Sequence, residues 1–260
     1  MSTRGTVSLG VAASIGPDLA AQLAPLAEQA GFHALWVNDT PGADALAVLQ
    51  AAAAATSTLV LATGVLPVDR RSPRQIASQV QTARLPQDRL VLGIGSGQAR
   101  TRVLDSVRDA AAELRAALAA TVLVGALGPK MRRLAAEQTD GVLLSWLTPD
   151  IARAQAGEAH TVRSTAHVAL YVRTALDPAA SPRLQEETAR YAGYPSYAAN
   201  FDRLGIDAND TVLDAATGHS ADDLESYRVG VDEVVLRAIT PGDDPADYRT
   251  FIERAAALLG

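Results

Sequence analysis

The alternation of short apolar runs with longer alanine-rich stretches constrains the fold of this chain most strongly, because it occurs eight times in 260 residues. The apolar runs are nearly continuous, as in strands that are covered on both faces, so we expect a parallel sheet. The predicted strands are Val7–Val11, Ala34–Asn38, Leu59–Gly64, Leu90–Ile94, Val122–Val124, Val142–Trp146, Val168–Arg173 and Val234–Arg237. Eight strands, each followed by helix, predict an α/β fold of the (β/α)₈ TIM-barrel type.

Helical patterns fill the stretches between these strands. The predicted helices are Pro17–Ala30, Ala43–Ala55, Pro73–Ala83, Thr101–Ala119, Pro129–Gln138, Pro149–Ala159, at least two after Pro182, and Pro245–Leu259. We expect one domain over residues 1–260, with helices of 182–228 inserted between the seventh and eighth strands.

Composition narrows the class of protein. The absence of cysteine excludes disulfides, thiolate metal sites and a cysteine nucleophile. A net charge of −6 and an aromatic content of only 4% argue against a nucleic-acid surface. Neither a signal peptide nor an apolar run of membrane-spanning length is apparent, so we expect a soluble, cytoplasmic protein with a small-molecule substrate and no membrane partner. A homodimer stays open.

The segment Val122–Met131 is the most informative turn, because a buried strand breaks there into glycines and a helix opens at Pro129. Such a helix start presents free backbone N–H groups and a partial positive charge, which together favour an anion. Lys130 adds an ammonium group beside them. The alternative is ordinary strand-to-helix punctuation with no ligand.

In a TIM barrel, functional residues lie in the turns after the strands. Glycine is concentrated in three of these turns, where it lets the backbone pass close to a flat ligand. The remaining local feature is the basic run Arg70-Arg71-Ser-Pro-Arg74, which is either a solvated loop or a holder of an anionic ligand.

Five segments in order on the predicted strands carry a family resemblance, and Gly230–Arg237 adds a weaker one. The five are Gly31–Asp39, Leu61–Pro67, Arg89–Gly97, Val124–Met131 and Asp140–Pro149. Together they resemble the bacterial luciferase-like family of flavin and deazaflavin oxidoreductases. The resemblance implies a luciferase-like TIM barrel that binds coenzyme F420 or FMN over the strand ends. The deazaflavin branch looks nearer, so F420 is favoured over FMN, with hydride transfer to or from a small organic substrate.

The resemblance also implies where the cofactor would lie. Many members of the family have a cis peptide behind the ring, and Gly64-Val65 is the matching pair. The cofactor phosphate would lie at the turn before the fifth helix. The implied cofactor-binding residues are Asn38, Asp39, Gly64, Val65, Gly95, Ser96, Gly97, Gly125, Gly128, Pro129, Lys130 and Trp146.

The implied catalytic residues are Asp39 and Thr40. Several deazaflavin enzymes of this family carry a histidine after the matching aspartate as a proton donor or acceptor, and here Thr40 stands at that place. The four histidines are too widely spread for a metal cluster. Asp39 has an alternative role as a helix cap or turn residue.

A second departure from the family is length, because 98–120 holds little more than one helix where members usually carry an insertion. Thr40 and the missing insertion favour a catalytically silent relative that binds a cofactor or protein without turnover. A phosphate site after a barrel strand also suits an unrelated barrel enzyme such as an aldolase or phosphosugar isomerase. The aromatics Tyr191, Tyr194, Tyr197 and Phe201 are interpreted as core, with a substrate wall as the alternative.

Overall fold

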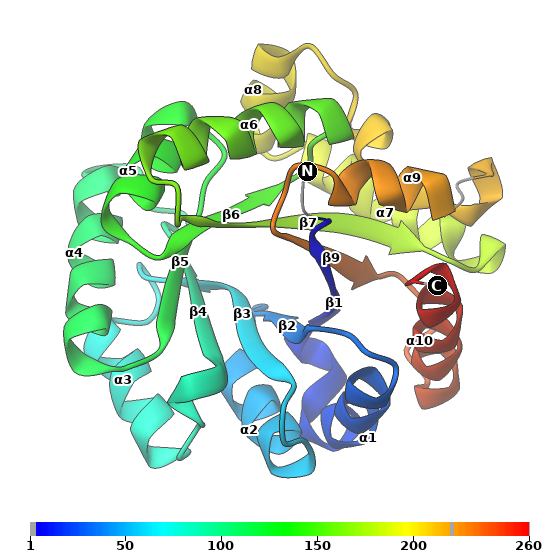
Figure 1. Ribbon diagram of the computed structural model, residues 1–260, viewed down its shortest axis with the longest axis horizontal. Helices are drawn as coiled ribbons and strands as arrows, with labels where there is room; N and C mark the ends of the chain where they lie inside the picture. The colour runs from blue at the N-terminus through cyan, green and yellow to red at the C-terminus, as the bar shows by residue number, and fades with distance from the viewer. Residues whose placement is uncertain (1–3, 219–220, 260) are drawn as a thin grey trace.

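The computed structural model describes residues 4–218 and 221–259, and its strands form a closed parallel barrel ringed by helices (Figure 1). The order of pairing is β6-β5-β4-β3-β2-β1-β9-β7, and β6 also pairs with β7, which closes the ring. The barrel strands are β1 Thr6–Ala12, β2 Ala34–Asn38, β3 Val60–Pro67, β4 Leu90–Gly95, β5 Thr121–Gly125, β6 Gly141–Ser145, β7 His167–Ala175 and β9 Glu233–Ala238. The predicted TIM barrel is confirmed.

The helices follow the strands around the outside. They are α1 Gly16–Gln29, α2 Ala45–Ala55, α3 Pro73–Thr82, α4 Val103–Ala117, α5 Pro129–Gln138, α6 Pro149–Val162, α7 Ser181–Ala192, α8 Pro195–Leu204, α9 Ala221–Arg228 and α10 Pro245–Leu259. Several begin with a proline in their first turn, which supplies the φ angle of a helix where an N–H would be unpaired. Between β4 and β5 the one helix is α4, as the length of 98–120 predicted.

The structure differs from the predicted elements at several strand ends, such as that of β3, which runs to Pro67 where Gly64 was predicted, and in one additional strand. A ninth strand of two residues, β8 Leu213–Asp214, pairs with the end of β7 outside the ring. Strand β6 ends at Ser145, one residue earlier than predicted, because Trp146 has a positive φ of 58° that breaks the ladder.

The barrel wall separates two of the three buried hydrophobic clusters, and the third lies around Trp146 and Phe201. The larger of the two lies between the strands and the surrounding helices and is built mainly of leucine, valine and alanine. The smaller one fills the barrel itself and includes Trp36, Leu123 and Tyr171. Within it the rings of Trp36 and Tyr171 meet edge to face, with centroids 5.8 Å apart. The barrel is therefore a packed core, and ligands must bind at its ends.

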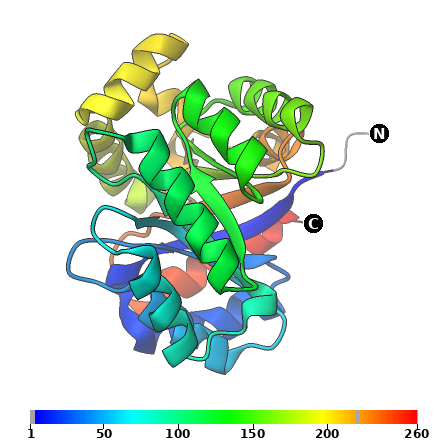
Figure 2. The same cartoon turned by 90° about the vertical axis from the view of Figure 1, so that its left-hand side faces the viewer.

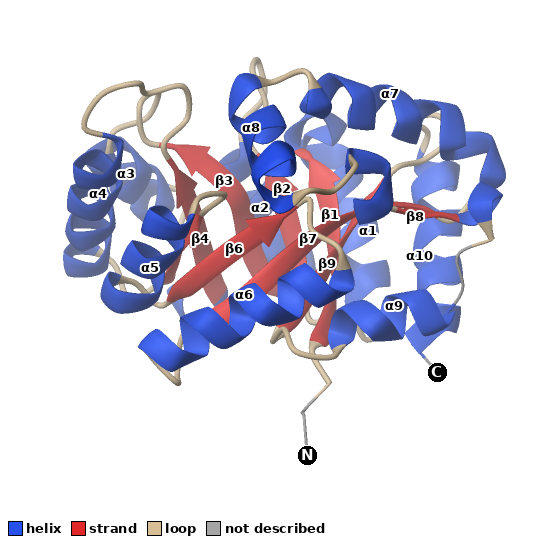
Figure 3. Ribbon diagram, turned by 90° about the horizontal axis from the view of Figure 1, so that it is seen from above, coloured by secondary structure: helices blue, strands red, loops and turns tan. Residues whose placement is uncertain are grey.

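The two ends of the barrel differ. At the amino ends of the strands, the buried Glu233 carboxylate accepts hydrogen bonds from Ser8 Oγ and Trp36 Nε1, and it pairs with His167 Nε2 at 2.9 Å. Helices α7 and α8 lie at the opposite end, toward which the strand arrows point (Figures 2 and 3). No helix of the described residues has the length and apolar character that a membrane span requires.

Candidate active site

Because the strands are parallel, all their carboxyl ends open on one rim of the barrel, and this brings the predicted turns together. Strand β3 is irregular there, since its pairing with β4 shifts between Gly64 and Leu66. The peptide bond Gly64-Val65 at this bulge is cis, as predicted. Asn38, the last residue of β2, donates a side-chain hydrogen bond from Nδ2 to the Gly64 carbonyl and so ties the two strand ends together.

Two of the glycines make room for Val65. A Cβ at Gly95 would come within 2.7 Å of Val65 Cγ2, and one at Gly125 within 3.0 Å of Val65 Cγ1. Gly97, with a φ of 61°, is closed in by Asp69 instead, whose carboxylate accepts from the Gln98 N–H at 2.8 Å. Ser96 lies between Gly95 and Gly97 in the same turn after β4. The predicted residues from Gly64 to Gly125 therefore form one contiguous surface at the rim.

The start of α5 has a different character. Gly128 is its N-cap residue and supplies no side chain to the helix end, and Pro129 has no N–H. The N–H groups of Gly128, Lys130 and Met131 are then the ones that an α-helix leaves without an internal acceptor. A Cβ at Gly128 would meet nothing within 4 Å, and both Pro129 and Lys130 are exposed. The turn is thus an open cationic corner at the rim.

Asp39 is engaged within the protein. Its side chain is only 5% exposed and accepts from the Ala45 N–H at 3.2 Å. It also lies 3.4 Å from Arg70 Nη2 and 3.6 Å from Arg71 Nη2. Arg71 reaches on to Asp44, the N-cap of α2, at 3.1 Å. Two arginines of the basic run therefore hold the β2–α2 turn in place.

Buried polar atoms without a hydrogen-bond partner gather near this rim. Six side chains of the described residues carry such an atom, and four of them face the carboxyl ends of the strands: Asn38 Oδ1, Thr40 Oγ1, Trp146 Nε1 and Tyr171 Oη. Tyr171 is level with the last residue of β6, Ser145, in the barrel register. Its hydroxyl lies 2.4 Å from where a Cβ of Gly64 would stand. Unpartnered buried donors and acceptors are rare in proteins and mark places where a ligand or water binds.

Trp146 is fully enclosed. It packs against Tyr191 and Phe201, with ring centroids 5.0 Å and 6.1 Å away, and the guanidinium of Arg173 stacks 4.2 Å from its ring centroid. The aromatics of α7 and α8 are thus largely core, as interpreted from their spacing, although Tyr194 is 45% exposed. The structure places Trp146 in this cluster and gives its ring no exposed surface.

A charged cluster at the barrel mouth was not predicted. Glu187 of α7 lies 3.3 Å from Arg173 Nε, 3.7 Å from Arg190 Nη2 and 3.8 Å from Arg237 Nη2. Burial alone would raise the pKa of Glu187, but Arg237 and Arg173 outweigh burial and lower the pKa below its ordinary value. Glu187 is therefore ionised at neutral pH. The detectable signal was a lone arginine at the carboxyl end of each of two apolar strands, Arg173 and Arg237.

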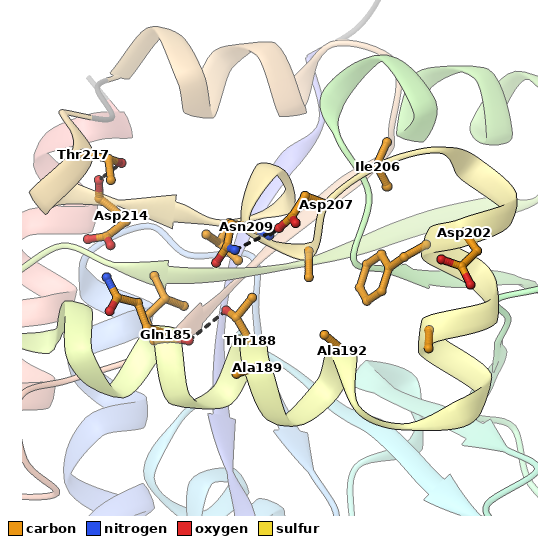
Figure 4. Close-up of a pocket in the computed structure, with 15 residues that line it drawn as sticks. Gln185, Thr188, Ala189, Ala192, Asp202, Ile206, Asp207, Asn209, Asp214 and Thr217 are labelled. Carbon is orange, nitrogen blue, oxygen red and sulfur yellow. Dashed lines mark hydrogen bonds between the residues drawn. The ribbon is translucent and has the colours of Figure 1, made fainter.

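Two hollows lie near these elements. One of about 320 Å³, called the mouth pocket below, is lined by Thr40, Glu187, Arg190 and Arg237, among others, and so opens at the barrel mouth. The larger one, of about 720 Å³, is lined only by residues of 184–217, from α7 to the short helix after β8 (Figure 4). None of the predicted site residues lines the larger hollow. The described residues contain no cluster of three or more metal-ligating side chains.

The sequence matches known proteins over part of its length. The family model described as luciferase-like monooxygenase matches residues 2–118. A curated relative, 5,10-methylenetetrahydromethanopterin reductase from Methanolobus tindarius, is 28% identical over 160 residues. That match covers 48% of this chain and 49% of the relative, so it spans about half the length of each.

Solved structures match over nearly the whole chain. The coenzyme F420-dependent tetrahydromethanopterin reductase from Methanopyrus kandleri has a TM-score of 0.73 at 18% identity, covering 98% of each chain. An F420-dependent secondary alcohol dehydrogenase in complex with an F420-acetone adduct also scores 0.73, at 16% identity, covering 98% of this chain and 99% of that one. The FMN-bound oxygenating constituent of 3,6-diketocamphane monooxygenase from Pseudomonas putida scores 0.69 at 14% identity, covering 96% and 97%.

The first part of the chain therefore matches the luciferase-like monooxygenase family, and the whole chain has the barrel fold of these solved structures. The match to the family model lies in residues 2–118, and the fold match covers 98% of the chain. The solved structures that this chain resembles include an F420-dependent reductase, an F420-dependent dehydrogenase and an FMN-bound monooxygenase constituent.

Proposed function

We propose that this protein binds coenzyme F420 over the strand ends and uses it for hydride transfer to or from a small organic substrate. The observation that carries the proposal is the rim itself, where an open helix start and unpartnered buried polar atoms lie on the same end of the barrel. A phosphate-bearing heterocycle would supply an anion for the first and hydrogen-bond partners for the second.

The residues present fit such a cofactor at both of its ends. Gly128, Pro129 and Lys130 would hold the phosphate, because the start of α5 leaves N–H groups without an internal acceptor, a Cβ at Gly128 would meet nothing within 4 Å, and Lys130 is exposed. The surface of Gly64, Val65, Gly95, Ser96, Gly97 and Gly125 would lie behind the ring system. Asn38 Oδ1 and Thr40 Oγ1 would find partners on the ring or on substrate.

The bound deazaflavin would supply a two-electron hydride carrier, and the protein residues would position the reactants. Asp39 fixes the β2–α2 turn through Arg70 and Arg71, which places Thr40 at the edge of the mouth pocket. The Thr40 hydroxyl can both donate and accept, so it would orient a substrate oxygen or a water at the reacting carbon. In this proposal Asp39 is a positioning residue and Thr40 is the residue that contacts substrate.

F420 is favoured over FMN because the curated relative is named as a methylenetetrahydromethanopterin reductase and two of the structural neighbours are F420-dependent. FMN remains the competing cofactor, since another neighbour was solved with FMN. Anaerobic titration of the purified protein with oxidised F420 and separately with FMN, followed by cofactor absorbance and fluorescence, decides between them. Tighter binding of F420 supports the proposal, and tighter binding of FMN contradicts the choice of cofactor.

A second candidate is a relative that binds the cofactor without turnover. The engagement of the Asp39 carboxylate by Arg70, Arg71 and the Ala45 N–H favours it, because that carboxylate is not open to substrate. The two candidates differ in the effect of Thr40→Val, which removes the hydroxyl and keeps the shape. Hydride exchange between reduced cofactor and an electrophilic carbonyl or imine that slows in Thr40→Val supports catalysis. Cofactor binding with no exchange in the wild type supports the silent relative.

A further inference from the structure

One carboxylate in the mouth pocket, that of Glu187, is surrounded by more positive charge than it balances. Three guanidinium groups, those of Arg173, Arg190 and Arg237, surround the single carboxylate of Glu187. Arg183, at the outer end, is already paired with Asp243 at 2.9 Å and donates to the Thr240 carbonyl. Glu186 is exposed at the outer edge. Around Glu187 itself, three guanidinium groups therefore face one carboxylate.

The arginines differ in what they have left to donate. Arg173 is committed: it hydrogen-bonds Glu187 at 3.3 Å and Ser145 Oγ at 2.5 Å, and it stacks on Trp146. Arg190 and Arg237 lie 3.7 Å and 3.8 Å from Glu187, which is longer than a hydrogen bond, and Arg237 donates from Nη1 to the Ala238 carbonyl. Their attraction to Glu187 is therefore a charge interaction that leaves most of their N–H donors available to another group.

Thr40 adds an independent observation in the same pocket. Its Oγ1 is buried and has no hydrogen-bond partner, and Thr40 lines the same pocket as Arg190 and Arg237. A hydroxyl and two forked cations facing one hollow of about 320 Å³ match a small carboxylate or another compact oxyanion, which accepts several hydrogen bonds at once. Ala238, Ile239 and Tyr248 supply an apolar side for the rest of such a molecule.

We infer that the substrate of this site is a small organic acid, whose anionic group is held by Arg190, Arg237 and the Thr40 hydroxyl. The inference names the substrate class of the same site, and it rests on the proposed function, because the bound acid is a substrate only if the protein transfers hydride. The anion-binding itself needs no cofactor. Glu187 competes with the substrate anion for the same two arginines.

Because of that competition, removing an arginine should weaken the binding of an anion, whereas removing the Glu187 carboxylate should strengthen it. Benzoate is the probe and benzamide its uncharged isostere, titrated calorimetrically at low salt into the full chain without cofactor. Benzoate is expected to bind and benzamide to bind at least about tenfold more weakly. Arg237→Gln should weaken benzoate by about tenfold, and Arg190→Gln, which is half exposed and safe for folding, by less. Arg249→Gln on the exposed face of α10 is the matched control and should change nothing.

Glu187→Gln should tighten benzoate binding, because it removes the competing carboxylate. If the cluster serves only to fasten α7 to the barrel, this variant loses stability and gains no affinity, and that result overturns the inference. So does equal binding of the two probes, or no benzoate binding at about 10 mM. Binding of F420 or FMN without benzoate defeats this inference alone. Binding of benzoate without either cofactor leaves the anion site standing and defeats the proposed function.

Discussion

Replacing Gly128 by aspartate should stabilise the cofactor-free protein and lower its affinity for a phosphate-bearing cofactor. Gly128 is the N-cap of α5, gives that helix no side-chain hydrogen bond, and has an ordinary φ of −87°. A Cβ there meets nothing within 4 Å, so the new side chain enters without a clash. An aspartate cap adds a few tenths of a kcal/mol over glycine, and its charge at the helix start adds about 0.3–1 kcal/mol.

The same carboxylate would stand in the space that the phosphate needs. Two like charges about 5 Å apart repel by about 0.8 kcal/mol in water and about 3 kcal/mol at the effective dielectric constant of a protein surface. The corner at Gly128 is half-buried, so we expect a loss of about 1–3 kcal/mol, or roughly five- to a hundredfold in affinity. Salt should reduce the loss, because exposed charges are screened.

The assay compares Gly128→Asp with Gly128→Asn, which offers an uncharged cap of the same shape. Chemical denaturation should show both variants at least as stable as the wild type. FMN and F420 should bind the asparagine variant nearly as tightly as the wild type and the aspartate variant much more weakly. Riboflavin, which has no phosphate, should not distinguish the two variants. If the aspartate variant binds the phosphate-bearing cofactors as tightly as the asparagine variant, the α5 corner does not hold a phosphate.

Three further predictions follow from other contacts. Lys130→Ala should weaken the binding of phosphate-bearing cofactors by about tenfold. Because Lys130 is exposed, the same change should alter the free energy of unfolding by less than about 0.5 kcal/mol. Unchanged cofactor binding argues against a role for Lys130. Gly64→Ala places a Cβ 2.4 Å from the Tyr171 hydroxyl and should destabilise by about 1–3 kcal/mol in denaturant melts, whereas Tyr171→Phe, which removes only an unpartnered hydroxyl, should cost less than about 1 kcal/mol. Burial alone would lower the pKa of His167, but the hydrogen bond and charge of Glu233 raise it above its ordinary value of 6.5. The stability that this pair contributes is therefore complete below pH 6.5 and is lost as the pH rises through the raised pKa. His167→Gln should remove this pH dependence of the free energy of unfolding, and an unchanged pH dependence contradicts the assignment.

The architecture was predictable because every barrel strand is covered on both faces. Continuous apolar runs such as Val122–Val124 mark such strands without any knowledge of their partners. The start of α5 at Pro129 was found to the residue, since proline in the first turn is a local signal. The end of the sixth strand was predicted one residue too late, at Trp146, because the sequence carries no signal for the positive φ of that residue.

The charged mouth of the barrel depends on a contact between distant segments. Arg173 and Arg237 were visible as the last residues of predicted strands, but they gain their meaning from Glu187 on a helix that folds back over the barrel. Likewise, the sequence allows the basic run at Arg70 and Arg71 to be either a solvated loop or a site that holds an anionic ligand. Only the structure shows that Asp39 is its partner. The roles of Asp39 and Thr40 in binding or catalysis stay predictions.

Lys130 permits one direct measurement of where the cofactor binds, because it is the only lysine in the chain. Its ε-amine can be acetylated under mild conditions, and the modified peptide is resolved by mass spectrometry from the one bearing the N-terminal amine. If the cofactor phosphate lies at the start of α5, saturating F420 or FMN slows acetylation of Lys130 severalfold and riboflavin does not. Acetylation of Lys130 at the same rate with and without bound F420 or FMN would contradict the account.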